Sequence, residues 1–118
     1  MKIRYTSFSR LDVASILDFS RRHFGQQQSE QYASLMSEGV ASIRADPFRP
    51  SCRRCPQYGE RIQAFHLSLV RKRRGSASHV IYFRVAGELG SQELQILRIL
   101  HERMEPLSEI EMALRSFK

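Results

Sequence analysis

Residues 96–106, ILRILHERMEP, decide how the last part of the chain folds. Four of the first five residues are isoleucine or leucine, which predicts a buried β-strand. Arg98 nevertheless stands in the middle of this strand, and the stretch continues with the polar residues His101, Glu102 and Arg103. An arginine is almost never fully buried without a partner, so either the fold or the function must require Arg98.

Alternation of side chains along a strand divides these residues between two faces. We expect one face to carry Leu94, Ile96, Arg98 and Leu100, and the other to carry Leu97, Ile99, His101 and Arg103. A structural role is favoured for Arg98, in which its stem follows apolar neighbours and its charge reaches a carboxylate such as Glu93 or Asp46.

Two further strand patterns precede this one. Residues 61–70, RIQAFHLSLV, place Phe65, Leu67 and Leu69 on one face. Residues 79–85, HVIYFRV, alternate between two sets, Ile81, Phe83, Val85 and Val80, Tyr82, Arg84. A basic turn at residues 71–78, RKRRGSAS, and a second turn, AGELGSQ, connect the strands. Consecutive strands with short connections predict an antiparallel meander.

The N-terminal part predicts one edge strand and two helices. Residues 2–6 form the strand candidate, and Ser9 with Asp12 matches a capping box that opens a helix ending near Gly25. A second amphipathic helix is expected over residues 29–45. The short segment GQQQ would join the two helices into an antiparallel hairpin.

The tail predicts a short third helix. Ser108 and Glu111 match a second capping box, and the apolar residues that follow helical spacing are Ile110, Ala113, Leu114 and Phe117. This helix could close on the core or serve as a docking surface. The length of 118 residues and the 42% hydrophobic content fit a single α+β domain over residues 1–118, with residues 107–118 as a C-terminal extension.

The charge of the chain is concentrated in its middle. The net charge is +7, and residues 44–74 carry the whole excess, with nine basic and two acidic side chains. Such a patch lowers the cost of approaching nucleic acid, a nucleic-acid-bound enzyme or an acidic protein, or it is a solvated basic loop. No apolar run reaches the roughly 18 residues of a membrane span, and no signal peptide is recognised, so we expect a cytoplasmic protein without a membrane partner.

Cys52 and Cys55 form a CxxC pair within residues 47–59, which we expect to be an exposed loop. A CxxC can be a redox pair or half of a zinc site, but no second pair follows at a suitable distance. Two free thiols are therefore favoured. The remaining candidate ligands, His23, His66 and His79, have no metal-ligand spacing, so we expect no metal and no cofactor.

His101 and Arg103 are candidate catalytic residues because groups at a strand end reach solvent. A histidine can move a proton near neutral pH, and an arginine can clamp a phosphate, as ribonuclease chemistry requires. A strand-terminal histidine is, however, more often a hydrogen-bonded structural residue than a catalyst.

The order of elements and several segments resemble the RelE/ParE superfamily of bacterial toxin–antitoxin systems. These segments are Asp12 and Ile16 in the first helix, a second helix ending at ADP, Gly59 to Arg61 before a strand, HVIYFRV, and ILRILHERME. Together they cover residues 2 to about 106. The pairing of IYFRV with ILRILHER is similar to the ParE branch in particular.

The resemblance implies a RelE/ParE-like α+β fold, with an N-terminal strand and an α-helical hairpin packed on an antiparallel β-meander, and a short C-terminal helix. In the ParE branch it implies a toxin that inhibits DNA gyrase, takes part in plasmid stabilisation and is not a catalyst. A cognate ParD-like antitoxin, acidic and with a ribbon-helix-helix N-terminus, would form a hetero-oligomer with it. The target-binding residues implied are Arg61, Arg84, Arg98, His101 and Arg103.

The RelE branch implies an alternative, cleavage of mRNA on translating ribosomes. His79 stands where an arginine would open the strand, and the tail SEIEMALRSFK contains no tyrosine. A nuclease site would have to be rebuilt from His79, His101 and Arg103.

Overall fold

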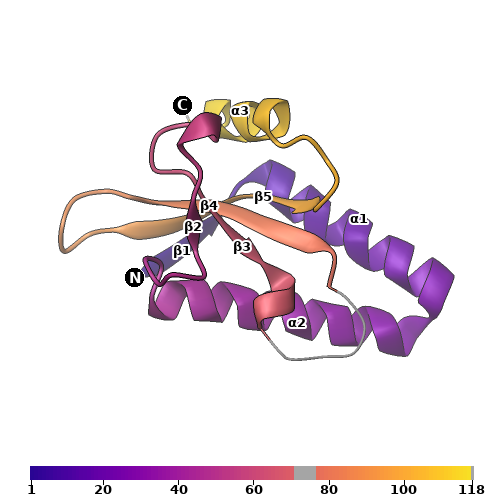
Figure 1. Ribbon diagram of the computed structural model, residues 1–118. Helices are drawn as coiled ribbons and strands as arrows, with labels where there is room; N and C mark the ends of the chain where they lie inside the picture. Colours follow the sequence, from indigo (N-terminus) through magenta and orange to yellow (C-terminus); the bar gives the residue numbers. More distant parts are fainter. Residues whose placement is uncertain (71–76, 118) are drawn as a thin grey trace.

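The computed structural model describes residues 1–70 and 77–117, which form a five-stranded sheet with helices on both faces (Figure 1). The strand order is β1-β5-β4-β3-β2, in which β1 pairs in parallel with β5 and the other pairs are antiparallel. This arrangement confirms the predicted α+β fold class. The elements are β1 Lys2–Tyr5, α1 Ser7–Phe24, α2 Gln26–Ala45, β2 Arg53–Arg54, β3 Gln63–His66, β4 His79–Ala86, β5 Glu93–His101 and α3 Leu107–Arg115.

A single residue, Thr6, separates β1 from α1. The hydroxyl oxygen of Thr6 accepts from the Ser9 amide at 2.9 Å, and the same hydroxyl donates to the Leu97 carbonyl at 2.6 Å. The predicted capping box at Ser9 and Asp12 is therefore wrong. Ser9 lies inside the first turn and is buried, and its hydroxyl donates to the Thr6 carbonyl. Thr6 serves as the cap because one side chain joins the helix start to the neighbouring strand.

Gly25 alone separates α1 from α2. Its φ of 93° is readily adopted by glycine, and its N–H donates to the Arg21 carbonyl as α1 ends. Residues 26–28, expected in the connection, belong to α2 instead. The Ser29 hydroxyl donates to the Leu17 carbonyl at 2.9 Å and so ties the second helix to the first.

The strands β3 and β2 differ from the prediction. β3 comprises only Gln63–His66, because residues 67–69 form a 3₁₀ turn in which the His66 ring accepts from the Ser68 amide. β2 lies within the expected loop and pairs with β3 at one edge of the sheet. The predicted basic turn falls outside the described residues except for residues 77 and 78.

A β-bulge in β5 changes which side chains share a face. The register shifts between Tyr82 and Phe83 of β4, which leaves Leu97 as an extra residue without a partner. Strict alternation therefore fails after Ile96, and the predicted grouping is wrong. Ile96 and Ile99 face the α1–α2 hairpin, whereas Leu97 and Leu100 face α3.

Two apolar clusters pack on the sheet. The cluster under the α1–α2 hairpin includes Leu35, Met36, Val40, Ile43, Phe65, Ile81, Phe83, Ile96 and Ile99. The cluster under α3 includes Cys55, Ile62, Val80, Tyr82, Leu97, Leu100, Ile110 and Ala113. The third helix thus closes on the core, which was one of its two predicted roles.

Helix α3 follows Pro106 and has no side-chain cap. The capping box predicted at Ser108 and Glu111 is wrong, since both residues lie within the helix. Among the helices of the described residues, none combines the length and the apolar character that crossing a bilayer requires.

Candidate functional site

Arg98 lies inside the molecule, between α1, β5 and α3. It is only 8% exposed, and its Nε and Nη2 donate to the two carboxylate oxygens of Asp12, each at 2.8 Å. Its Nη1 donates to Glu109 Oε2 at 2.8 Å. The predicted partners Glu93 and Asp46 are wrong, because the guanidinium stays inside the molecule and does not reach the margin of the sheet. The hydrogen bonds that Arg98 donates to Asp12 raise the pKa of Arg98, so the buried guanidinium stays charged.

The Asp12 carboxylate also holds the backbone of β5. Its Oδ2 also accepts from the Ile99 amide at 3.0 Å. The Arg98 guanidinium lies over the Phe8 ring, 5.3 Å from its centroid. These contacts give Arg98 a role in the fold. Its predicted contact with a target stays a prediction.

His79 and His101 meet where β4 begins and β5 ends. They are paired in register, and their rings form a T-shaped contact with centroids 5.6 Å apart. The Tyr32 hydroxyl of α2 lies 2.6 Å from His79 Nδ1. Burial lowers the pKa of His79 to about 4, and the charge of His101 acts in the same direction. His79 is therefore neutral at pH 7, whereas His101 is exposed.

Two more ionisable residues, His66 and Glu102, join this strand end. His66 Nε2 lies 2.6 Å from Glu102 Oε2, and this contact lowers the pKa of the Glu102 carboxyl. Arg103 is exposed, and its backbone amide donates to His101 Nδ1 at 3.1 Å. The structure thus brings together the three residues of the nuclease alternative. Tyr32 and the His66–Glu102 pair were missed, although the pairing of β3 with β4 could have indicated His66.

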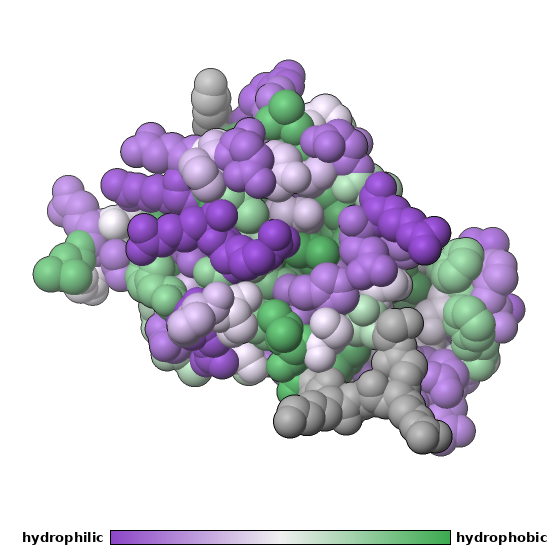
Figure 2. Space-filling view, in the orientation of Figure 1, coloured by the Kyte–Doolittle hydropathy of each residue, from purple (hydrophilic) through white to green (hydrophobic). Residues whose placement is uncertain are grey.

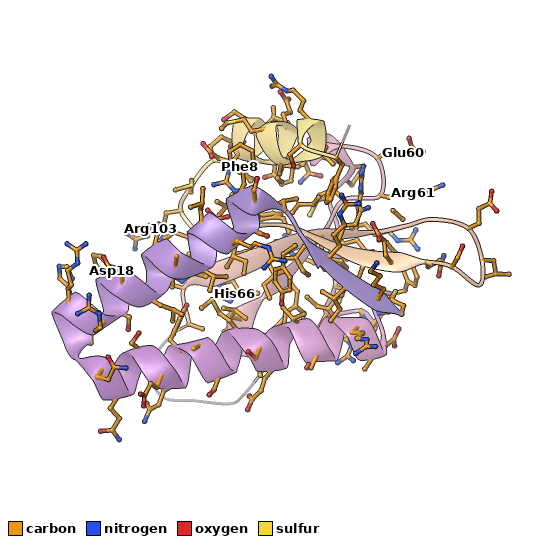
Figure 3. All side chains as sticks on the ribbon, turned by 180° about the vertical axis from the view of Figure 1, so that it is seen from behind. Phe8, Asp18, Glu60, Arg61, His66 and Arg103 are labelled. Carbon is orange, nitrogen blue, oxygen red and sulfur yellow. The ribbon has the colours of Figure 1, made fainter. Side chains whose placement is uncertain are left out.

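Arg61 and Arg84 lie away from the strand end that carries His79 and His101. Figure 3 shows Arg61 on the opposite side of the molecule from Arg103. Arg84 Nε donates to Gln95 Oε1 at 2.6 Å, and its guanidinium lies 5.5 Å from the Phe117 ring centroid. Burial lowers the pKa of Arg84, with a further contribution from the charge of Arg61. The five predicted target-binding residues therefore occupy three separate places rather than one surface.

The two cysteines do not form a pair. Both are free and buried, so their predicted exposure is wrong. Cys52 packs in the cluster under the hairpin and Cys55 in the cluster under α3, because β2 lies between them and its residues alternate between faces. Burial raises the pKa of both thiols. Within residues 1–70 and 77–117, no three side chains of His, Cys, Asp or Glu gather as ligands for a metal ion.

The fold is similar to those of solved bacterial toxins. One is titled "Chromosomal ParDE TA system from P. aeruginosa", with a TM-score of 0.66 and 21% identity over 86% of this chain and 95% of that chain. Another is a YoeB/ParE toxin from Agrobacterium tumefaciens, with a TM-score of 0.55 and 16% identity over 86% of this chain and 98% of that chain. At these identities the likeness establishes the fold.

Comparison with curated proteins found no significant match. The family model described as the ParE toxin of the type II toxin-antitoxin system, parDE, matches residues 3–106. This range contains both helices of the hairpin and all of the sheet except Lys2, the first residue of β1. The chain therefore belongs to the ParE toxin family of type II toxin–antitoxin systems.

Proposed function

We propose that this ParE-family toxin acts in the cytoplasm by inhibiting DNA gyrase, and so replication, until a ParD-like antitoxin neutralises it. The match of the ParE model over residues 3–106 carries the proposal, because the resemblance to this branch implies binding to gyrase rather than catalysis. A role in plasmid stabilisation would follow from the same pairing of toxin and antitoxin.

The protonation state of His79 supports an inhibitor over a nuclease. An effective general base has a pKa near the working pH, because both its protonation state and its proton affinity contribute to the rate. With its pKa at about 4, the His79 ring holds a proton too weakly to be an efficient base at pH 7. The contact with the Tyr32 hydroxyl also occupies one ring nitrogen.

A second candidate function, RelE-like mRNA cleavage on translating ribosomes, is favoured by the surroundings of His101. Because the Arg103 amide donates to Nδ1 of the His101 ring, the neutral ring carries its proton on Nε2. That N–H could donate a hydrogen bond to a phosphate or leaving-group oxygen, and the Arg103 guanidinium could bind the phosphate. Both side chains are exposed.

A groove between β1 and the hairpin supports the proposal that an antitoxin binds this chain. Two adjoining hollows of about 380 and 450 Å³ share Tyr5, Ser37 and Val40 in their walls. Arg10 lines the first hollow, and Arg44 lines the second. A partly apolar groove with a basic residue at each hollow fits an acidic amphipathic segment that folds on binding. Opposite charges would also speed the encounter.

Plasmid supercoiling by purified gyrase tests the proposal. The toxin is separated from any co-expressed partner, refolded and checked by circular dichroism, then titrated into the reaction. We expect reduced supercoiling or trapped linear DNA in proportion to added toxin, and reversal when the antitoxin is restored. Normal supercoiling with folded toxin at every concentration would exclude the gyrase tested, and mRNA cleavage on ribosomes would then be assayed.

Single substitutions separate the two functions. For the nuclease, His101→Ala or Arg103→Ala should reduce cleavage by about 10²-fold or more while the fold is retained, since the side chain no longer stabilises the transition state. For the inhibitor, the same changes should give graded decreases in gyrase inhibition. Arg22→Ala serves as the control, because Arg22 is exposed at the far end of α1 and pairs locally with Asp18.

A further inference from the structure

The backbone of Arg61 is held in a conformation that L-residues rarely adopt. Its φ is 64°, and among the described residues every other positive φ belongs to a glycine. The residue lies in the turn between β2 and β3, and its side chain is exposed. Glycine or asparagine would occupy this position with less strain, so the fold does not require an arginine here. Strain of this kind is characteristic of functional positions.

Arg61 belongs to a group of arginines on the side of the sheet that α3 covers in part. Arg84 lies close enough for the two charges to repel each other. Arg53 of β2 is opposite Ala64 of β3, which is opposite Tyr82 of β4, so Arg53 shares the face of Tyr82. Two strand spacings, roughly 10 Å, separate β2 from β4. Arg53 and Arg84 therefore come from the two strands that flank β3, and Arg61 comes from the turn between β2 and β3.

Among the described residues, no ion pair joins these three arginines to a carboxylate, although the charge of Glu93 acts on Arg84. In the part of the chain that the structure describes, Arg53 and Arg61 form no ion pair, and Arg84 is bonded to the neutral Gln95. Glu93, which lies near Arg84, is already engaged by Arg4 and Gln95. Figure 2 shows strongly hydrophilic side chains gathered over the region where Figure 1 places β2.

The composition of this surface favours nucleic acid over protein as its partner. No large exposed hydrophobic residue belongs to β2, β3, β4 or the turn at residues 55–62. The core of a protein interface is apolar and depleted in charge, whereas nucleic-acid interfaces are polar and strongly positive. The nearest rings are already engaged: Tyr82 is buried, Tyr58 packs edge to face against it, and the guanidinium groups of Arg4 and Arg84 lie over Phe117. Phosphates of a duplex, rather than bases of a single strand, fit such a surface.

We infer that Arg53, Arg61 and Arg84 form a contact surface for the phosphate backbone of double-stranded nucleic acid. The surface lies apart from His101 and Arg103 and from the groove beside β1. The inference goes beyond the proposed inhibition of gyrase and does not depend on it. A toxin with this surface would bind a duplex without reading its sequence, because phosphate contacts carry no sequence information.

Fluorescence anisotropy with a labelled duplex of about 20 base pairs tests the inference, at several salt concentrations and without gyrase. The double variant Arg53→Gln with Arg61→Asn should bind at least tenfold more weakly. Its plot of log affinity against log salt should be shallower by about two, close to one for each phosphate that the variant no longer binds. Asparagine tolerates the conformation of Arg61, so the fold should be retained, and a thermal melt checks this.

The matched control removes two charges from a distant site, as Arg21→Gln with Arg22→Gln. Both residues lie in the last turn of α1, at the tip of the hairpin beside Asp18, which Figure 3 places far from Arg61. This variant should bind the duplex within about twofold of the parent. Equal decreases in the two double variants would show that only net charge matters and would overturn the assignment.

Competing probes test the class of partner. Duplex RNA should bind as the DNA duplex does, because both present phosphates, whereas single-stranded DNA should bind less tightly. Tighter binding to a polyglutamate peptide of matched charge than to either duplex would overturn the assignment to nucleic acid. So would duplex binding weaker than about 10⁻⁴ M at physiological salt. Because gyrase is absent, a negative result here leaves the gyrase proposal untouched, and the reverse also holds.

Discussion

The two faces of the sheet are held by different forces. Under the α1–α2 hairpin, the contact is made by apolar side chains such as Ile43 and Phe83, both fully buried. Under α3 the apolar cluster is smaller, and Arg98 connects three elements through Asp12 and Glu109. Stability on the first face follows buried area and volume. On the second it depends on a buried charge that must keep its partners.

This difference explains why an arginine stands in an apolar strand. A nine-residue helix covers less of the sheet than the hairpin of 18 and 20 residues does. The guanidinium fills the space between α1 and α3 and donates to a carboxylate of each. Removing Arg98 would leave the Asp12 carboxylate nearly buried without its cation, which makes the α3 face specific but intolerant of change.

The largest expected effect comes from Arg98→Ala. Because Asp12 would be left buried without its cation, the free energy of unfolding should fall by about 3–5 kcal/mol. Urea denaturation followed by circular dichroism measures this decrease. Arg22→Ala, in an exposed ion pair, should leave the urea midpoint unchanged. If the two variants were destabilised equally, the charge cluster would not support the α3 face as described.

A smaller effect is expected from pH on the hairpin face. The folded pKa of His79, about 4, lies below the ordinary value of 6.5, so below pH 6.5 the unfolded chain binds a proton that the native ring resists. Stability should fall as pH decreases from about 6.5 to 4, by about 1–2 kcal/mol after allowing for the partial exposure of the ring.

Urea midpoints for the parent and for His79→Gln at pH 7.5, 6 and 5 measure this contribution. The groups that face the ring are Tyr32, His101, Glu102, Asp12 and His66. The variant should lose less stability on acidification than the parent. Identical curves for the two proteins would mean that other groups carry the pH dependence.

The smallest expected change in stability concerns Arg61, in the turn between β2 and β3 at the edge of the sheet. Arg61→Gly should raise the free energy of unfolding by about 0.5–1 kcal/mol, because glycine adopts a positive φ without strain but loses more chain entropy. Glu60→Gly is the control, since Glu60 has no positive φ and should gain nothing. Lower stability of Arg61→Gly would show that the arginine is required by the fold after all.

The sequence could predict the elements that carry their own periodic signal. The second helix ends before Pro47 as expected, and the strand at His79 begins at the predicted residue. The strand β2 could not be found, because two arginines in succession have no apolar alternation. The bulge at Leu97 was equally invisible, since it is set by the register between two strands and not by either strand alone.

For the candidate site, the sequence could show that Arg98 needs a partner but not which one. Asp12 lies 86 residues away, and its position after Ser9 resembles a helix cap when only local contacts are considered. The meeting of His79 with His101 follows from a meander, so it could be anticipated. The Tyr32 contact could not, because it depends on how the hairpin packs across the sheet.

The parallel pairing of β1 with β5 has a consequence for how the toxin is made. The hydrogen bond from Thr6 to Leu97 spans 91 residues, so the first strand finds its place only after the last strand has left the ribosome. Pairings so distant along the chain slow folding. A newly made chain therefore passes through an interval in which its sheet is incomplete.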